Sequence, residues 1–180
     1  MELFAAADYR RTEVLCQLPC LADLALFSTV RMPDLGFVRE LRGLQTLSLD
    51  HLGRIEDYSP LDELISLWRL NLWREATLDS TSERPWPSLR QLLLSRTGAE
   101  VLHRLPDLTP NLQTLIIDEF ALESLEVLAG LPLRIVEIRE HQALLDLRAL
   151  AGRELRLRLD PGGGYLGLDE LGPGVRISYL

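Results

Sequence analysis

Apolar residues recur along this chain at a nearly constant interval. Two of them, separated by one other residue, follow further leucines at fixed offsets, as in Leu18, Leu21, Leu24 and Leu26. The apolar pairs are Leu24/Leu26, Leu47/Leu49, Leu70/Leu72, Leu92/Leu94, Leu115/Ile117, Val136/Ile138 and Leu157/Leu159, with a shortened last copy at Val175/Ile177. The steps from Leu24 to Leu47 and from Leu47 to Leu70 are equal, and the later steps up to Leu157 are the same or slightly shorter. A period of roughly 20–29 residues built on this leucine pattern predicts a solenoid.

Each apolar pair predicts a short strand, because alternate side chains of a strand point to the same face. Successive strands would pair in parallel, with the intervening residues on the concave side of an arc and the leucines filling its interior. We expect strands of about three to four residues and convex helices of about one to three turns. The predicted fold class is an α/β solenoid of about seven to eight repeats, which forms a single array over residues 1–180.

The segments between the strands carry their own signals. Residues 59–64 read as a helix start, with Ser59 as N-cap, proline at the first helical position and acids in the first turn. Residues 97–100 fit a capping box, and the leucine spacing over 122–128 favours a short helix or 3₁₀ turn. Proline and glycine predict irregular linkers at 84–87 and 161–164.

The two ends of the array are read from the same period. The step from Leu24 to Leu47, taken backwards from Leu24, reaches Met1, so residues 1–3 resemble the strand of one more repeat. Because the end of a solenoid needs a polar cap, we expect the chain to be a C-terminal piece of a longer protein. Residues 1–17 would then be a partial first repeat, and 160–180 an irregular C-terminal cap. The alternative is that residues 1–3 are an imperfect cap and the protein is complete.

Composition narrows the classes of partner. The net charge of −8 disfavours nucleic acid, which needs a cationic footprint. No run of apolar residues is long enough to cross a membrane. Every basic residue is arginine, so the segment holds neither a Schiff-base lysine nor a P-loop lysine. Cys16 and Cys20 read as small apolar fillers of the first interior layer, and their spacing disfavours a disulfide, which fits a reducing cytoplasm.

The sequence contains no catalytic constellation. The histidines, His51, His103 and His141, have no partner at metal-ligand spacing. We expect His103 on the convex surface and the other two at the rim. The glycines at 162–164 have no lysine after them and read as a turn. We therefore predict that this segment is not an enzyme and holds no metal or cofactor.

The concave side offers the candidate binding surface. Residues between the two core positions are Ala25, Ser48, Asn71, Leu93, Ile116, Glu137, Arg158 and Arg176. Residues just after the second core position are Phe27, Asp50, Trp73, Ser95, Asp118, Arg139 and Asp160. From these two rows we predict a protein-binding site at Asn71, Trp73, Leu93, Ile116, Asp118, Glu137, Arg139 and Arg158. Apolar and aromatic residues beside charges are typical of an interface core with a polar rim. The alternative is that the apolar members pack under neighbouring parts and the charged members are merely solvated.

The leucine pattern resembles the leucine-rich repeat family over essentially the whole chain. The phrases DYSPLDEL (57–64) and LEVLAGL (125–131) are similar to connectors of bacterial cytoplasmic arrays. Such arrays often follow a NACHT-type nucleoside-triphosphatase module in proteins similar to innate immune receptors. The resemblance implies a cytoplasmic, ligand-sensing region of an NLR-like antiphage defence protein, which binds a protein ligand and has an upstream NTPase. The alternatives are a stand-alone adaptor that binds a host protein, and the substrate-recognition region of an effector enzyme.

Overall fold

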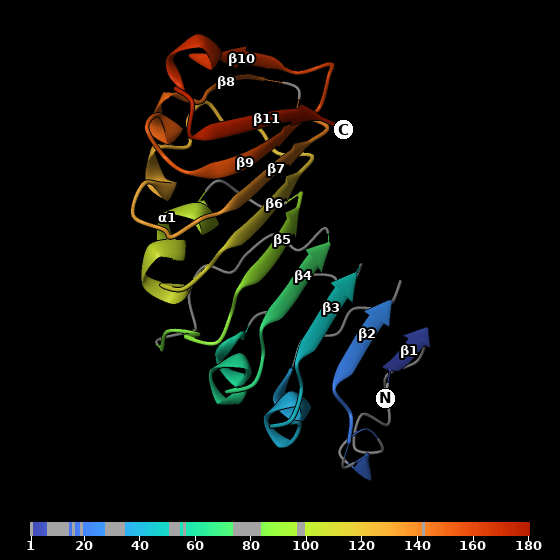
Figure 1. Ribbon diagram of the computed structural model, residues 1–180. Coiled ribbons are helices and arrows are strands. Elements are labelled where there is room, and N and C mark those ends of the chain that lie inside the picture. The colour runs from blue at the N-terminus through green and yellow to red at the C-terminus, as the bar shows by residue number, and fades with distance from the viewer. Residues whose placement is uncertain are drawn as a thin grey trace.

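Nine parallel strands form one continuous sheet in the computed structural model of the chain (Figure 1). The structure describes residues 2–6, 15, 17, 18, 20–27, 35–50, 55, 57–73, 84–96, 100–141 and 143–180. Each strand is five residues long and pairs with the next of the nine along the chain, and two short strands of a second sheet come between the last three. The strands are β1 (Glu2–Ala6), β2 (Asp23–Phe27), β3 (Thr46–Asp50), β4 (Arg69–Trp73), β5 (Gln91–Ser95), β6 (Thr114–Asp118), β7 (Ile135–Arg139), β9 (Leu155–Leu159) and β11 (Val175–Tyr179).

The return segments lie on one side of this sheet (Figure 1). Among the described residues they contain one α-helix, α1 (Glu100–Leu108), and several 3₁₀ helices of three to five residues. The 3₁₀ helices are η2 (Gly36–Glu40), η3 (Ser59–Glu63), η4 (Glu126–Leu128), η5 (Arg148–Leu150) and η6 (Leu168–Glu170). Near the C-terminal end, β8 (Leu144–Asp146) and β10 (Gly164–Leu166) form a second, two-stranded parallel sheet.

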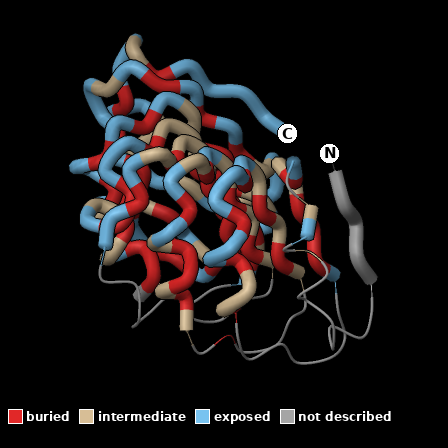
Figure 2. Tube along the Cα trace, turned by 90° about the horizontal axis from the view of Figure 1, so that it is seen from below, coloured by how far each residue is buried: buried red, intermediate tan, exposed pale blue. Residues whose placement is uncertain are grey.

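The core is a continuous layer of leucines between the sheet and the return segments. Leu47, Leu70 and Leu92 stack in register on neighbouring strands and are fully buried. In Figure 2 the buried positions run along the inside of the coil, with exposed positions on its outer turns. Burial of one leucine side chain contributes about 1.5–3 kcal/mol. Each turn makes these contacts only with its neighbours, so the stability of the array grows repeat by repeat.

The register expected from the seven apolar pairs is confirmed from β2 to β9, but both ends differ. Leu3 pairs with Leu24, so the first interval is two positions shorter than the step used to reach Met1. At the other end Val175 pairs with Leu155 and Ile177 with Leu157. The last copy is therefore shifted by two positions, because Leu155 adds a third apolar position to the alternation of β9. The nine strands of the sheet correspond to the seven apolar pairs, the last copy at Val175/Ile177 and the strand expected near residues 1–3, and each strand is longer than expected.

Several local predictions for the segments between the strands agree with the structure in part. The 3₁₀ helix η3 begins at Ser59, so its N-cap residue is Tyr58 rather than Ser59, and the backbone N–H of Ser59 donates to Oδ1 of Asp57 at 2.8 Å. The helix predicted after the capping box at 97–100 is present as α1 from Glu100 onwards, and residues 97–99 of the box lie outside the described residues. Of the short helix or 3₁₀ turn predicted over 122–128, the structure has the 3₁₀ helix η4 at its C-terminal end, Glu126–Leu128. Residues 160–180, expected as an irregular cap, contain β10, η6 and β11, and Gly164 starts a strand.

Candidate protein interface

The strand pairing gathers all eight predicted site residues on one face. Five of them stand side by side in one row across the sheet, and the other three lie in the next row. The first row is Asn71, Leu93, Ile116, Glu137 and Arg158, and the second is Trp73, Asp118 and Arg139, with Ser95 between Trp73 and Asp118. Arg176, placed beside Arg158 from the sequence, pairs with Arg156 instead, and Ser178 takes the position beside Arg158.

The apolar centre of this face is nearly closed. Leu93 and Ile116 are only 5% and 8% exposed, so the expectation that they present an open apolar patch is wrong. Neighbouring strands lie about 4.8 Å apart, and side chains of the adjacent rows therefore cover most of these two residues. Trp73 is half-buried at the side of this floor. Next to it, Asn71 donates a hydrogen bond of 2.8 Å from Nδ2 to Oγ of Ser48.

Two arginines enclose a carboxylate at the C-terminal half of the face. Glu137 on β7 is 4% exposed. Its Oε1 accepts from Nε of Arg139 at 2.6 Å and lies 2.5 Å from Nη2 of the same residue. Its Oε2 lies 3.3 Å from Nη1 of Arg158 on β9. The arginine side chains are 37% and 49% exposed, so each keeps donors that reach solvent and are available to a ligand.

A second charged ladder follows the carboxyl ends of the strands. Arg96, Glu119 and Glu140, which come directly after β5, β6 and β7, have φ values of 54°, 50° and 45°. Nε of Arg96 donates to Oε2 of Glu119, and this hydrogen bond is the main cause of the raised pKa of Arg96. The sequence gives little warning of these left-handed turns, because glycine and asparagine, which adopt them most easily, are absent at all three positions.

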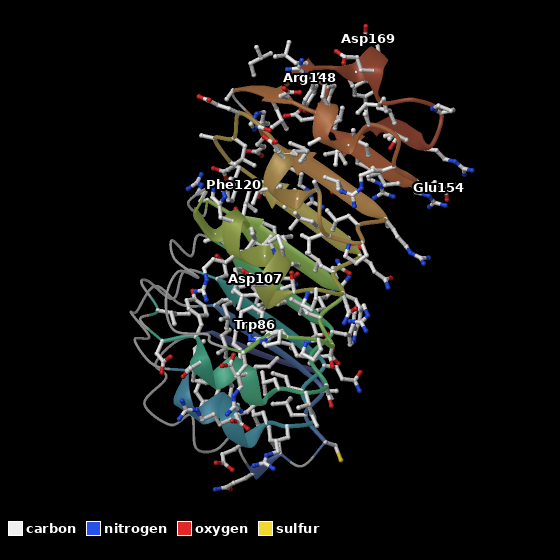
Figure 3. All side chains as sticks on the ribbon, turned by 90° about the vertical axis from the view of Figure 1, so that its left-hand side faces the viewer. Trp86, Asp107, Phe120, Arg148, Glu154 and Asp169 are labelled. Atoms are coloured by element: carbon white, nitrogen blue, oxygen red, sulfur yellow. The ribbon has the colours of Figure 1, made fainter. Side chains whose placement is uncertain are left out.

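Three arginines lie at the opposite, amino ends of the strands, and of these only Arg176 was named from the sequence. Arg134, Arg156 and Arg176 line a hollow of about 570 Å³ together with Glu154, Pro173 and Gly174. In Figure 3 nitrogen-tipped side chains project from the sheet beside the labelled Glu154. The intervals between the three arginines are close to the period of the leucines, and this recurrence could have identified them. We call this feature the arginine hollow.

The remaining candidates for chemistry are dispersed. His103 is exposed on α1, as expected. His141 is buried instead of lying at the rim, and its Nδ1 is 2.8 Å from the carbonyl oxygen of Phe120, to which it donates. Cys20 is an exposed free thiol rather than an interior filler, and Cys16 and His51 lie outside the described residues. Within the described part of the chain, no group of three or more His, Cys, Asp or Glu side chains is arranged to hold a metal ion.

None of the helices among the described residues is both long enough and apolar enough to cross a membrane. No protein-family model matches the chain, and no curated protein matches it significantly. Among solved structures, it is similar to an internalin, InlF, from Listeria monocytogenes, with a TM-score of 0.56 and 19% sequence identity. The match covers 92% of this chain and 45% of the internalin chain, so the chain spans less than half of that protein.

These observations define the class of the fold. A parallel sheet with one strand per turn, leucines stacked in register and short helical returns on one side is a solenoid. In particular, the chain has the fold of a leucine-rich repeat horseshoe, as in the internalin. Folds of this kind are typical of protein–protein interaction domains, because stacked repeats present an extended concave surface.

Proposed function

We propose that this chain is a non-catalytic recognition domain that binds a protein ligand on its concave face. The observation that carries the proposal is the gathering of the eight predicted residues into two adjacent rows over β4 to β9. This surface combines a half-buried tryptophan with two arginines whose outer donors reach solvent. Tryptophan and arginine are the residues that most often dominate binding energy at interfaces.

The residues of this face would have different roles. Trp73 would provide aromatic contact area at the edge of the floor formed by Leu93 and Ile116. Arg139 and Arg158 would donate to carboxylates or carbonyl oxygens of the ligand, since the guanidinium group forms paired hydrogen bonds with such acceptors. Glu137 is already satisfied by both arginines and would hold them in place rather than contact the ligand.

A double substitution tests this face. The protein would be immobilised, the partner that it captures from its native host identified, and that purified partner titrated against variants. Trp73→Ala with Arg139→Glu should weaken binding by about 100-fold or more, because two central contacts are lost. The control is Ile65→Ala with Arg42→Glu, two exposed residues outside the two concave rows, which gives the same change in charge and truncates an exposed apolar side chain. Equal affinity of the wild-type protein and the concave variant, with unchanged melting temperature, would refute the site.

We further propose that the domain is the sensing region of a cytoplasmic bacterial NLR-like protein in antiphage defence. The support is the similarity of residues 57–64 and 125–131 to the connectors of such arrays. The ligand would act on an attached NTPase module only if it prefers one state of the whole receptor. The coding sequence upstream of Met1 tests this context. A G-x-x-x-x-G-K-[ST] motif there would support it, and a native mass of 20.4 kDa would exclude it in favour of a stand-alone adaptor.

A further inference from the structure

The arginine hollow is a concentration of positive charge on a chain whose net charge is −8. Arg156 and Arg176 occupy directly paired positions on β9 and β11, and Arg134 comes just before β7. All three side chains are exposed and line the same hollow. Glu154 is the single acid among the lining residues. The hollow therefore carries a formal charge of about +2, from three arginines and one glutamate.

No described residue neutralises these arginines. None of the three forms a hydrogen bond or an ion pair with another side chain in the described part of the chain. Like charges directly opposite each other on paired strands also destabilise a sheet. The pair formed by Arg156 and Arg176 therefore costs stability in the free protein, and an anion bound between the two would remove that cost.

The floor of the hollow is held by the backbone. Leu155 N–H donates to the carbonyl oxygen of Gly174 at 3.2 Å, which ties the turn before β11 to the start of β9. A side chain at Gly174 would meet the carbonyl oxygen of Arg153, so the turn packs closely at this point. The arginines consequently extend from fixed backbone positions, and a ligand needs to order only their side chains.

The surroundings favour carboxylates of a protein over a nucleic acid. A phosphate backbone presents a long run of negative charge and needs a wide cationic footprint. Here Glu154 lies in the hollow, and Asp160 comes directly after β9, where these acids would repel such a run. A protein segment presents separate carboxylates that fit between these acids. On an extended segment alternate side chains lie about 6.6 Å apart, which equals the separation of Arg156 and Arg158 along β9.

We propose that the arginine hollow receives an acidic, extended segment of the protein ligand that runs along β9, with its carboxylates held by Arg156 together with Arg134 and Arg176 on the neighbouring strands. The proposal deepens the proposed protein-binding function and rests on it. Arg158 would take the next carboxylate along the strand and so connect the hollow to the two rows of the concave face. The domain would then recognise its ligand at two places. The acidic segment of the ligand would bind at the amino ends of β7, β9 and β11, and a second part of the ligand would contact Trp73.

Fluorescence anisotropy with short labelled peptides tests the hollow directly. A peptide that alternates Glu and Ser should bind saturably at about 50 mM NaCl, where screening is weak. The matched peptide that alternates Gln and Ser should bind at least about tenfold more weakly, because its hydrogen bonds are not charge-assisted. Arg156→Gln with Arg176→Gln should weaken binding of the Glu peptide by about tenfold or more.

The control is Arg42→Gln with Arg84→Gln, which changes the net charge equally at exposed positions outside the hollow. It should alter affinity by less than about twofold, because distant exposed charges are screened. An equal loss in both variants would show that only net charge matters and would overturn the proposal. The proposal would also be overturned if a single-stranded oligonucleotide bound more tightly than the Glu peptide and if the Arg156→Gln, Arg176→Gln variant lost that binding.

A charge-reversal variant distinguishes a specific loss of peptide binding from misfolding. Arg156→Glu with Arg176→Glu should bind a peptide that alternates Lys and Ser and release the Glu peptide, whereas a misfolded protein binds neither. Failure of the Glu peptide, while the captured protein still depends on Trp73 and Arg139, would overturn the acidic-segment proposal and leave the concave-face function standing. If the captured protein is also insensitive to Trp73 and Arg139, the concave-face function fails as well.

Discussion

Replacement of Leu70 by alanine is the sharpest test of the stacked core. Leu70 is fully buried and lies between Leu47 and Leu92 in the register of β3, β4 and β5. Truncation removes three carbon atoms from a closed layer and leaves a cavity, which should lower the free energy of unfolding by about 2–5 kcal/mol. For a chain of this length that corresponds to a fall in melting temperature of about 4–20 °C. Ile177→Ala, at a side chain 40% exposed on the terminal strand, should cost less than about 1.5 kcal/mol.

Urea unfolding of the single and double variants measures the effect and its range. Because each repeat contacts only its neighbours, Leu70→Ala and Leu92→Ala should be coupled by about 0.5 kcal/mol or more in a double-mutant cycle. Leu70→Ala and Leu157→Ala, which lie on β4 and β9, should be additive within about 0.5 kcal/mol. A loss below about 1 kcal/mol for Leu70→Ala would refute the register, and equal coupling at both distances would refute nearest-neighbour stacking.

Other perturbations follow from single contacts. Glu137→Gln keeps the shape of a nearly buried side chain but removes the charge that two arginines neutralise, and urea unfolding should show a loss of about 1–3 kcal/mol. Hydrogen bonds from Arg148 lower the pKa of Asp146 to about 2, so their stabilisation is present above about pH 3.8 and is lost as the pH falls towards 2. Arg148→Gln should raise that pKa towards 3.8 in an NMR titration of the Asp146 carboxyl group. Gly167 has a φ of +75° and lies against the Arg148 side chain, so Gly167→Ala should destabilise by about 1 kcal/mol or more, whereas Gly43→Ala, which faces open space, should be neutral or slightly stabilising in thermal melts.

The middle of the fold could be predicted because one physical pattern sets it. Alternate apolar residues bury one face of each strand, and a slip of one residue would turn that face to solvent. The pairs from Leu24 to Leu157 therefore fix the register without any knowledge of the turns between them. At the ends this argument weakens. Leu155, Leu157 and Leu159 are all buried on β9, so Val175 can align with either of the first two by alternation alone.

The sequence predicted which residues of the candidate site share a row, but it did not predict how far each side chain is exposed to solvent. Period two places Ile116 and Glu137 on the concave side, and the pairing of β6 with β7 confirms that they are neighbours. How far each is covered depends on the directions of long side chains in adjacent rows, which the sequence does not specify. Glu137 is covered because Arg139 and Arg158 both fold over it. His141 is buried for a similar reason, since its ring donates to the carbonyl oxygen of Phe120 in the preceding turn.

In this molecule, the residues that stabilise the core and the residues proposed to bind the ligand alternate along the same strands. On β7, Val136 and Ile138 belong to the buried leucine layer, whereas Arg139 points to the concave surface. Because the two sets face opposite sides, charge at the concave positions can change along the array while the core stays the same. Substitutions at Arg156 and Arg176 should therefore alter binding with little effect on unfolding, and removal of that like-charged pair should, if anything, raise stability slightly. Glu137 is the exception, because its carboxylate is nearly buried and belongs to both sets at once.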